Sequence, residues 1–196
     1  MPRAGLDTAA VVEAAGELAD AGGLEALTLS SVASRLGVKP PSLYSHVAGL
    51  PDLRARLAAL AASELADALV PAVSGRAAGD ALRGAGHAYR RWALAHPGRH
   101  AALQFVQLRN EPATKPATKP AAEPAAARLV ELMVSVMHGY AIEGDAAIHA
   151  VRAIRAAIYG FVALEAGGGF AIPLASDESF EWLLTLLDRG LSAQPT

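Results

Sequence analysis

The sequence predicts an all-α protein of about nine helices. Hydrophobic residues make up 53% of the 196 residues, and much of this apolar content is alanine, the residue most favourable to helix. Aromatic residues are only 5%, which fits packed helices better than a sandwich of β-branched and aromatic strands. Apolar residues recur at helical spacing along most of the chain, and no stretch alternates convincingly as a strand.

Capping and stop residues delimit the first two predicted helices. The first begins at Asp7 or Thr8, either of which is a suitable N-cap, and ends at Gly22-Gly23. Thr28 caps the second helix, and Gly37 ends it. Two short helices with a brief connection between them are therefore expected at the N-terminus.

Two further helices begin beside proline. A third, short helix fits residues 41–47, with proline in its first turn, where the missing N–H costs nothing. A longer fourth helix begins at Pro51 and extends to about Val70, before Pro71. Asp52 in its first turn is favoured by the helix dipole.

The remaining chain predicts five more helices and one connection without regular structure. The helices cover about 80–95, then on to about 108, 125–140, 145–166, and a last one capped by Ser176 or Asp177. From Pro112 to Pro124, proline occurs at every fourth position, which a helix interior cannot accommodate. We therefore expect a flexible connection over about 111–124.

Composition and charge exclude several classes of protein. The chain has no cysteine, which excludes a disulfide framework and thiolate metal sites and fits a reducing cytosol. The N-terminus lacks the apolar core of a signal peptide, and no run of about 18 uncharged apolar residues predicts a membrane span. We expect a cytoplasmic protein with no membrane contact and no cofactor. The formal net charge of −2 says nothing about its partners.

Residues 27–47 carry the pattern that indicates function. They predict two short helices around a tight turn at Gly37, where small Ala33 permits the helices to cross closely. The residues expected in the core beneath them are Leu18, Val32, Ala33, Leu36, Val38, Leu43 and Val47. The residues expected to point outward are Lys39, Pro40, Ser42, Ser45 and His46, with Tyr44 at one edge. A helix displayed in this way on a three-helix scaffold fits a DNA major groove.

This segment resembles the helix-turn-helix of the tetracycline-repressor (TetR) family of transcriptional regulators. The order Leu-Thr, a small apolar pair, Leu-Gly-Val, Pro-Ser-Leu-Tyr and His-Val has the family's spacing throughout, and the resemblance covers residues 6–57 strongly. Ala95-His96-Pro97 after Trp92, and the run from Gly160 to Glu165, are similar to one subgroup of the family. The resemblance implies a helix-turn-helix DNA-binding domain over 1–54 and a ligand-binding and dimerisation domain over 55–196.

The resemblance implies DNA-contacting roles for eight residues. Thr28 would contact a phosphate, because free N–H groups and the dipole at a helix N-terminus favour an anion, and Ser30 would face DNA beside it. The residues that would lie along the groove are Lys39, Pro40, Ser42 and Ser45. Tyr44 and His46 would hold the DNA backbone and fix the register; alternatively, their rings cap the small core.

Two departures from the family weaken phosphate binding. Leu50 stands where many members have a lysine at the start of the fourth helix, and the N-terminal arm offers only Arg3. Residues 1–57 contain five basic and six acidic residues. We therefore expect few ion-paired phosphates per subunit and a shallow salt dependence, which makes a dimer necessary for useful affinity.

The resemblance implies a homodimer formed by the last two helices. Their apolar stripes suit either the core of one chain or an interface between chains; the family's four-helix dimer bundle favours the interface. The interface residues implied are Ile154, Ile158, Phe161, Leu164, Phe180, Leu183, Leu184 and Leu187.

The remaining helices would enclose a largely apolar cavity for an unidentified small-molecule effector. The candidate lining residues, each of which also suits an ordinary core, are Trp92, His96, His100, Phe105, Met133, Met137, Tyr159 and Glu165. Tyr159 stands where the subgroup often has histidine, which implies a different ligand. His96 and His100 have the spacing of a metal pair, but Pro97-Gly98 interrupts the helix and no carboxylate completes a set, so no metal is expected.

Two other classes of function fit the sequence less well. An enzyme needs a nucleophile with its base, a phosphate loop or a metal set, and the sequence has none of these motifs. A helical module that uses its helix-turn-helix to bind protein is supported only by the weak basic balance. The resemblance favours a regulator, most simply a repressor that a small molecule releases from a palindromic operator; activation stays open.

Overall fold

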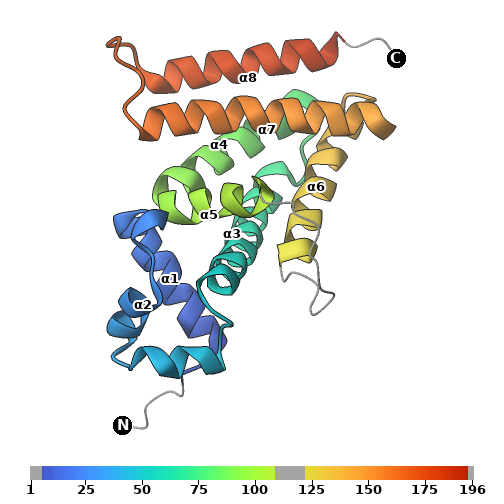
Figure 1. The fold of residues 1–196 in the computed structure, drawn as a ribbon. Helices are drawn as coiled ribbons and strands as arrows, with labels where there is room; N and C mark the ends of the chain where they lie inside the picture. The colour runs from blue at the N-terminus through green and yellow to red at the C-terminus, as the bar shows by residue number, and fades with distance from the viewer. Residues whose placement is uncertain (1–5, 109–121, 194–196) are drawn as a thin grey trace. The chain divides into compact units, whose positions relative to one another are not determined.

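The structure is a computed structural model that describes residues 6–108 and 122–193, except for the side chains of 104–108 and 122–124. Within these residues all regular structure is helical, which confirms the predicted all-α class. The elements, in chain order (Figure 1), are α1 (Thr8–Gly22), η1 (Leu24–Ala26), α2 (Leu29–Leu36), η2 (Pro40–Ser45), α3 (Leu50–Val73), α4 (Ala78–Ala95), α5 (Pro97–Leu108), α6 (Ala122–His138), α7 (Gly144–Ala166) and α8 (Ser176–Ser192); η1 and η2 are 3-10 helices.

Three predicted boundaries were wrong, each at a proline. The third helix, predicted over 41–47, is the 3-10 helix η2, which covers Pro40–Ser45. The fourth helix passes through Pro71 and ends at Val73; the proline lies in the last turn, where it breaks little of the hydrogen-bond ladder. α6 begins at Ala122 and contains Pro124 in its first turn, so 122–124 are helical. The rest of the predicted flexible connection lies outside the described residues.

The chain forms two compact units. The first comprises residues 1–64 and 95–126, and the second comprises residues 65–94 and 127–196. The division falls inside α3, after Glu64, and the first unit also takes in α5. Residues 27–47 therefore fold together with α5, a helix that begins about 50 residues later in the chain. The domain boundary near Arg54 stays a prediction.

The core of the first unit is the one that the sequence predicted. Val32, Ala33, Leu43 and Val47 are all buried, and Leu18, Leu36 and Val38 pack against them from the edge. Residues from α1, η1, α3 and α5 complete the cluster, among them Val11, Ala15, Leu27, Leu53, Leu57 and Ala102.

An ion cluster fixes α5 to α1 within the first unit. The Arg99 side chain of α5 is 7% exposed and pairs with Glu13 and Asp20 of α1 and with Glu64 of α3, while its backbone N–H donates to Asp20 Oδ1 at 2.9 Å. Burial raises the pKa of Glu64, against the charge of Arg99, which lowers it. A buried guanidinium tolerates little displacement from such partners, because the uncompensated charge would be costly.

The second unit is built around α4, α7 and α8. Figure 1 shows α7 and α8 running side by side. Leu82, Ile154, Ile158, Phe180 and Leu184 are buried among these helices. Close packing depends on Gly86, since a Cβ there would lie 2.6 Å from Leu184 Cδ2.

A substitution at Gly98 tests the contact between α5 and α1. A Cβ at this position would lie 2.0 Å from the carbonyl carbon of Ala19, so Gly98→Ala must displace backbone. We expect Gly98→Ala to lower the free energy of unfolding by at least about 2 kcal/mol in urea denaturation. Gly190→Ala, in α8 with open space around it, is the matched control and should be neutral or slightly stabilising. Equal effects of the two substitutions would contradict this packing.

Candidate nucleic-acid interface

The turn between α2 and η2 is formed by Gly37. Its φ of 68° and ψ of 28° lie in the left-handed region, and its N–H bonds back to the carbonyls of Ala33 and Ser34. The Val38 N–H also donates to the Ala33 carbonyl, at 3.0 Å. Glycine takes this conformation without a steric cost, so the chain leaves α2 at a fixed angle.

The start of α2 is held by a reciprocal cap. The Ser31 N–H donates to Thr28 Oγ1 at 3.0 Å, and the Thr28 N–H donates to Ser31 Oγ at 3.0 Å. The Thr28 hydroxyl therefore caps the helix and remains exposed, beside exposed Ser30. This arrangement orients the first turn of α2, whose free N–H groups are suited to an anion.

The η2 segment presents a short polar surface over a buried support. Leu43 is fully buried and Val47 nearly so, while Tyr44 is 63% exposed. The Ser42 N–H donates to the Lys39 carbonyl at 2.9 Å, and Ser45 Oγ donates to the Ser42 carbonyl at 2.9 Å. The Leu43 side chain thus fixes the segment, and its neighbours face solvent.

The predicted DNA-contacting residues occupy the surface. The exposed ones are Thr28, Ser30, Lys39, Pro40, Ser42, Tyr44 and Ser45; His46 is half-buried. With most of its side chain in solvent, Tyr44 does not cap the core, and the alternative interpretation of this ring is excluded. Half-buried His46 is compatible both with a contact to the DNA backbone and with a ring that caps the core.

Most cations of this region are already bound within the protein. Arg35 pairs with Glu17, Arg56 Nε pairs with Asp52 at 2.9 Å, and Arg54 donates to the Leu24 carbonyl at 3.3 Å. Burial would raise the pKa of Asp52, but the Ala48 N–H and Arg56 outweigh it and lower that pKa. Lys39 has no ion-pair partner among the described residues, which makes it the cation best placed for a phosphate or a base edge.

The structure places the eight predicted ligand-pocket residues in different surroundings. His96 and His100 belong to the first unit, where His96 Nδ1 lies 3.3 Å from Asp20 Oδ2 and His100 is buried. The side chain of Phe105 lies outside the described part of the chain. In the second unit Trp92 and Met137 are core residues, and Met133 and Tyr159 are half-buried.

Glu165, the last predicted pocket residue, forms an ion pair with Arg90. Arg90 Nε donates to Glu165 Oε2 at 2.7 Å, and Arg90 Nη1 pairs with Asp177 at 2.7 Å. The Arg90 hydrogen bond lowers the pKa of Glu165, although burial acts to raise it. This carboxylate therefore holds α4 to α7 and is not free for a ligand.

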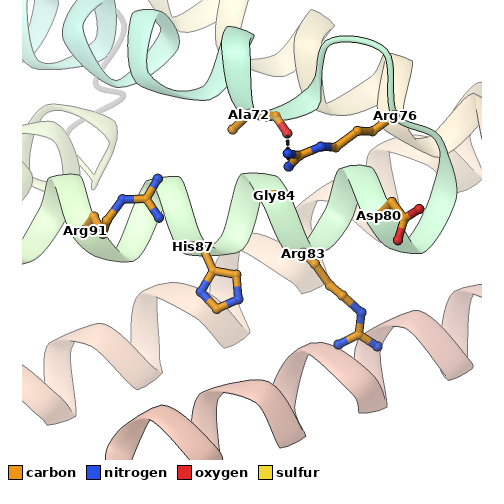
Figure 2. A pocket seen from close by; sticks show the side chains of 7 residues that line it. All are labelled: Ala72, Arg76, Asp80, Arg83, Gly84, His87 and Arg91. Atoms are coloured by element: carbon orange, nitrogen blue, oxygen red, sulfur yellow. Dashed lines mark hydrogen bonds between the residues drawn. The ribbon is translucent and has the colours of Figure 1, made fainter.

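The second unit instead contains a polar hollow that sequence reasoning missed. It is lined by Ala72, Arg76, Asp80, Arg83, Gly84, His87 and Arg91 (Figure 2). The available signal was the recurrence of charged residues at helical spacing along α4, which is also typical of an ordinary solvated helix face.

The predicted dimer residues divide into two groups. Ile154, Ile158, Phe180 and Leu184 are at most 5% exposed. A side chain buried in its own chain has no surface left to bury against a second one, so these four are core residues and were misassigned. Phe161, Leu183 and Leu187 are half-buried, and Leu164 is exposed.

The apolar surface of α8 lies on residues that the prediction omitted. Trp182 is 68% exposed and Leu186 is 49% exposed, one helical turn apart. Ile172 and Leu174, in the connection between α7 and α8, are also more than two-thirds exposed.

Among the described residues no group of three or more His, Asp or Glu side chains could hold a metal ion.

Comparison with known proteins identifies the family. Residues 82–187 match the family model of the tetracyclin repressor-like C-terminal domain. The HTH-type transcriptional regulator YobS of Bacillus subtilis is 34% identical over 170 residues, 86% of this chain and 84% of that protein. The HTH-type transcriptional regulator Rv0681 of Mycobacterium tuberculosis is 34% identical over 97% of this chain and 84% of its own length.

A solved structure shows the same fold. The crystal structure of a possible TetR family transcriptional regulator from Streptomyces coelicolor has a TM-score of 0.72 at 22% identity, covering 95% of this chain and 99% of its own. Members of this family bind operator DNA and act as dimers with small-molecule effectors. The chain belongs to the TetR family and is a DNA-binding transcriptional regulator.

Proposed function

We propose that this regulator is a cytoplasmic homodimeric repressor, which a small molecule releases from a palindromic operator. The observation that carries the proposal is the η2 surface: Ser42, Tyr44 and Ser45 face solvent while Leu43 between them is fully buried. The buried Leu43 holds η2 in place, and the exposed hydroxyl groups on either side of it are suited to hydrogen bonds with base edges and phosphates.

Each half of a palindrome needs its own reading segment, and therefore a second protomer. α7 is 23 residues long and apolar, but only 22% of its most apolar window is buried in one chain. By length and composition alone it also passes for a membrane span, as one helix of a soluble protein often does. A partner helix covering α7 and the Trp182 and Leu186 face of α8 accounts for this exposed apolar surface.

Release by a ligand requires that the ligand bind one conformation better than the other. α3 is suited to linking the two events, because it begins just after η2 in the first unit and ends in the second unit. An effector bound in the second unit would then bias the operator-binding state through this continuous helix.

A second candidate function is a module that binds another protein through η2. The pairing of Arg35 and Arg56 with carboxylates favours it, because it leaves few free cations for phosphates. The following experiments separate the two, since only the regulator selects a DNA sequence. No catalytic role is proposed.

Selection of binding sites from a random duplex pool tests whether η2 recognises a DNA sequence. Wild-type protein should recover one palindromic consensus. A variant carrying Ser42→Ala and Tyr44→Ala should bind that duplex at least about tenfold more weakly, since it loses contacts to bases and backbone. The control variant, His138→Ala with Ser192→Ala, removes one ring and one hydroxyl from exposed positions of the second unit and should bind as wild type. Absence of any enriched sequence at low salt would favour the protein-binding module.

The salt dependence of operator affinity tests the charge distribution. Lys39 has no ion-pair partner among the described residues, and Arg3 is the one basic residue that the sequence has before α1. A dimer should therefore show a slope of log K against log salt between about −2 and about −4. Lys39→Gln should make this slope shallower by about two in the dimer. A wild-type slope steeper than about −7 would mean that other cations reach the phosphates.

Light scattering after size-exclusion chromatography tests the interface. Wild type should have twice the chain mass of 20.1 kDa, and Trp182→Glu should have the mass of one chain, because a buried charge at the interface is costly. Glu178→Ala, also exposed on α8, is the control and should stay dimeric. A dimeric Trp182→Glu protein with unchanged operator affinity would place the interface elsewhere.

A further inference from the structure

The polar hollow beside α4 has the chemistry of an anion site. Its volume is about 470 Å³, within the range of small-molecule sites. Its lining carries three guanidinium groups and one imidazole but only one carboxylate, from Asp80. In a chain with a net charge of −2, this is a local concentration of positive charge.

Two of the lining side chains, Arg83 and His87, form a wall that already has acidic partners. Arg83 lies 3.4 Å from Glu181 Oε2 and 3.6 Å from Asp188 Oδ2, and His87 Nε2 lies 2.6 Å from Glu181 Oε1. In Figure 2 both side chains extend from α4 on the side away from Arg76. Their acidic partners on α8 fix them in place, so their positions do not depend on a ligand.

The other two arginines have no acidic partner among the described residues. Arg76 Nη1 donates to the Ala72 carbonyl at 2.9 Å, and its other donors stay unused. Arg91 is exposed and has no hydrogen-bond or ion-pair partner in the described part of the chain. Guanidinium groups with free donors bind carboxylate and phosphate oxygens in pairs.

Gly84 forms the floor between these two arginines. A Cβ at this position would lie 2.2 Å from the Ala72 carbonyl oxygen and 2.6 Å from Arg76 Nη1. Only glycine therefore lets the end of α3 approach α4 and lets the Arg76 guanidinium lie directly over the helix. Arg91 follows Gly84 by two helical turns, about 10 Å along the axis, and therefore lies on the same face of α4 as Gly84.

We propose that this hollow, held by Arg76 and Arg91, binds a small organic anion with several carboxylate or phosphate groups, and that the effector belongs to this class. The inference rests on the proposed function, since only a regulator has an effector. It differs from the largely apolar cavity expected from the sequence, and shares no residue with it. A bound anion would join the α3–α4 connection to the C-terminal part of α4.

Thermal unfolding of the full chain with potassium citrate or potassium phosphate, against potassium chloride at equal ionic strength, tests the site. We expect at least one of the two anions, well above its Kd, to raise Tm by about 5 °C more than chloride does. Arg76→Gln with Arg91→Gln should abolish this difference. The matched control, Arg128→Gln with Arg152→Gln, removes two exposed guanidinium groups of the second unit outside the hollow and should retain it. No specific stabilisation by either anion, or equal loss in both double variants, would overturn the site.

Operator affinity, measured in the same salts, separates this inference from the proposed function. Without added anion, the Arg76→Gln, Arg91→Gln protein should bind the selected duplex as wild type does. A loss there would mean that these arginines bind DNA phosphates rather than a free anion, and would overturn the site. The anion that stabilises wild type should change its operator affinity at least about tenfold, and leave the variant unchanged. Intact operator binding with no such change would overturn the assignment to the effector, whereas absence of operator binding by wild type would overturn the proposed function alone.

Discussion

The guanidinium of Arg99 lies among three carboxylates with only 7% of the side chain exposed, and the first unit depends on this interaction. Two of the carboxylates belong to α1 and the third to α3, so one side chain of α5 fixes three helices to one another. The approach is close enough that a Cβ at Gly16 would lie 2.5 Å from Arg99 Nε. Charged groups at this depth are stable only in a specific geometry, which restricts α1 to one position relative to α5.

That restriction reaches the DNA-binding surface through the apolar core. α1 contributes Val11 and Ala15 to the same cluster as Val32, Leu43 and Val47, so the position of η2 follows from the position of α1. The η2 segment is only six residues long. Its order comes from the Gly37 turn at one end and buried Val47 at the other, and this leaves Ser42, Tyr44 and Ser45 free to face a partner.

Local signals in the sequence predicted the structure of residues 27–47 well. Thr28 and Gly37 mark the ends of α2 because capping and left-handed turns are decided by neighbouring residues, and the core beneath η2 followed from spacing alone. The errors were in features that depend on distant residues. A hydrophobic stripe does not reveal its partner, so Ile154 and Phe180 looked like interface residues and are core residues. The sequence gives no sign that Glu165 pairs with Arg90, which lies 75 residues earlier in the chain. The hollow under Arg76 depends on the close approach that Gly84 allows, and no spacing rule predicts such an approach.

In the proposed complex, the exposed face of η2 reads the major groove of each half of a palindrome. Protection of guanine N7 from methylation on the selected operator tests it most directly, because N7 lies in the major groove. We expect two protected clusters on one face of the duplex, about one helical turn apart between centres. Protection confined to a single cluster, or unprotected N7 atoms under a bound protein, would contradict it.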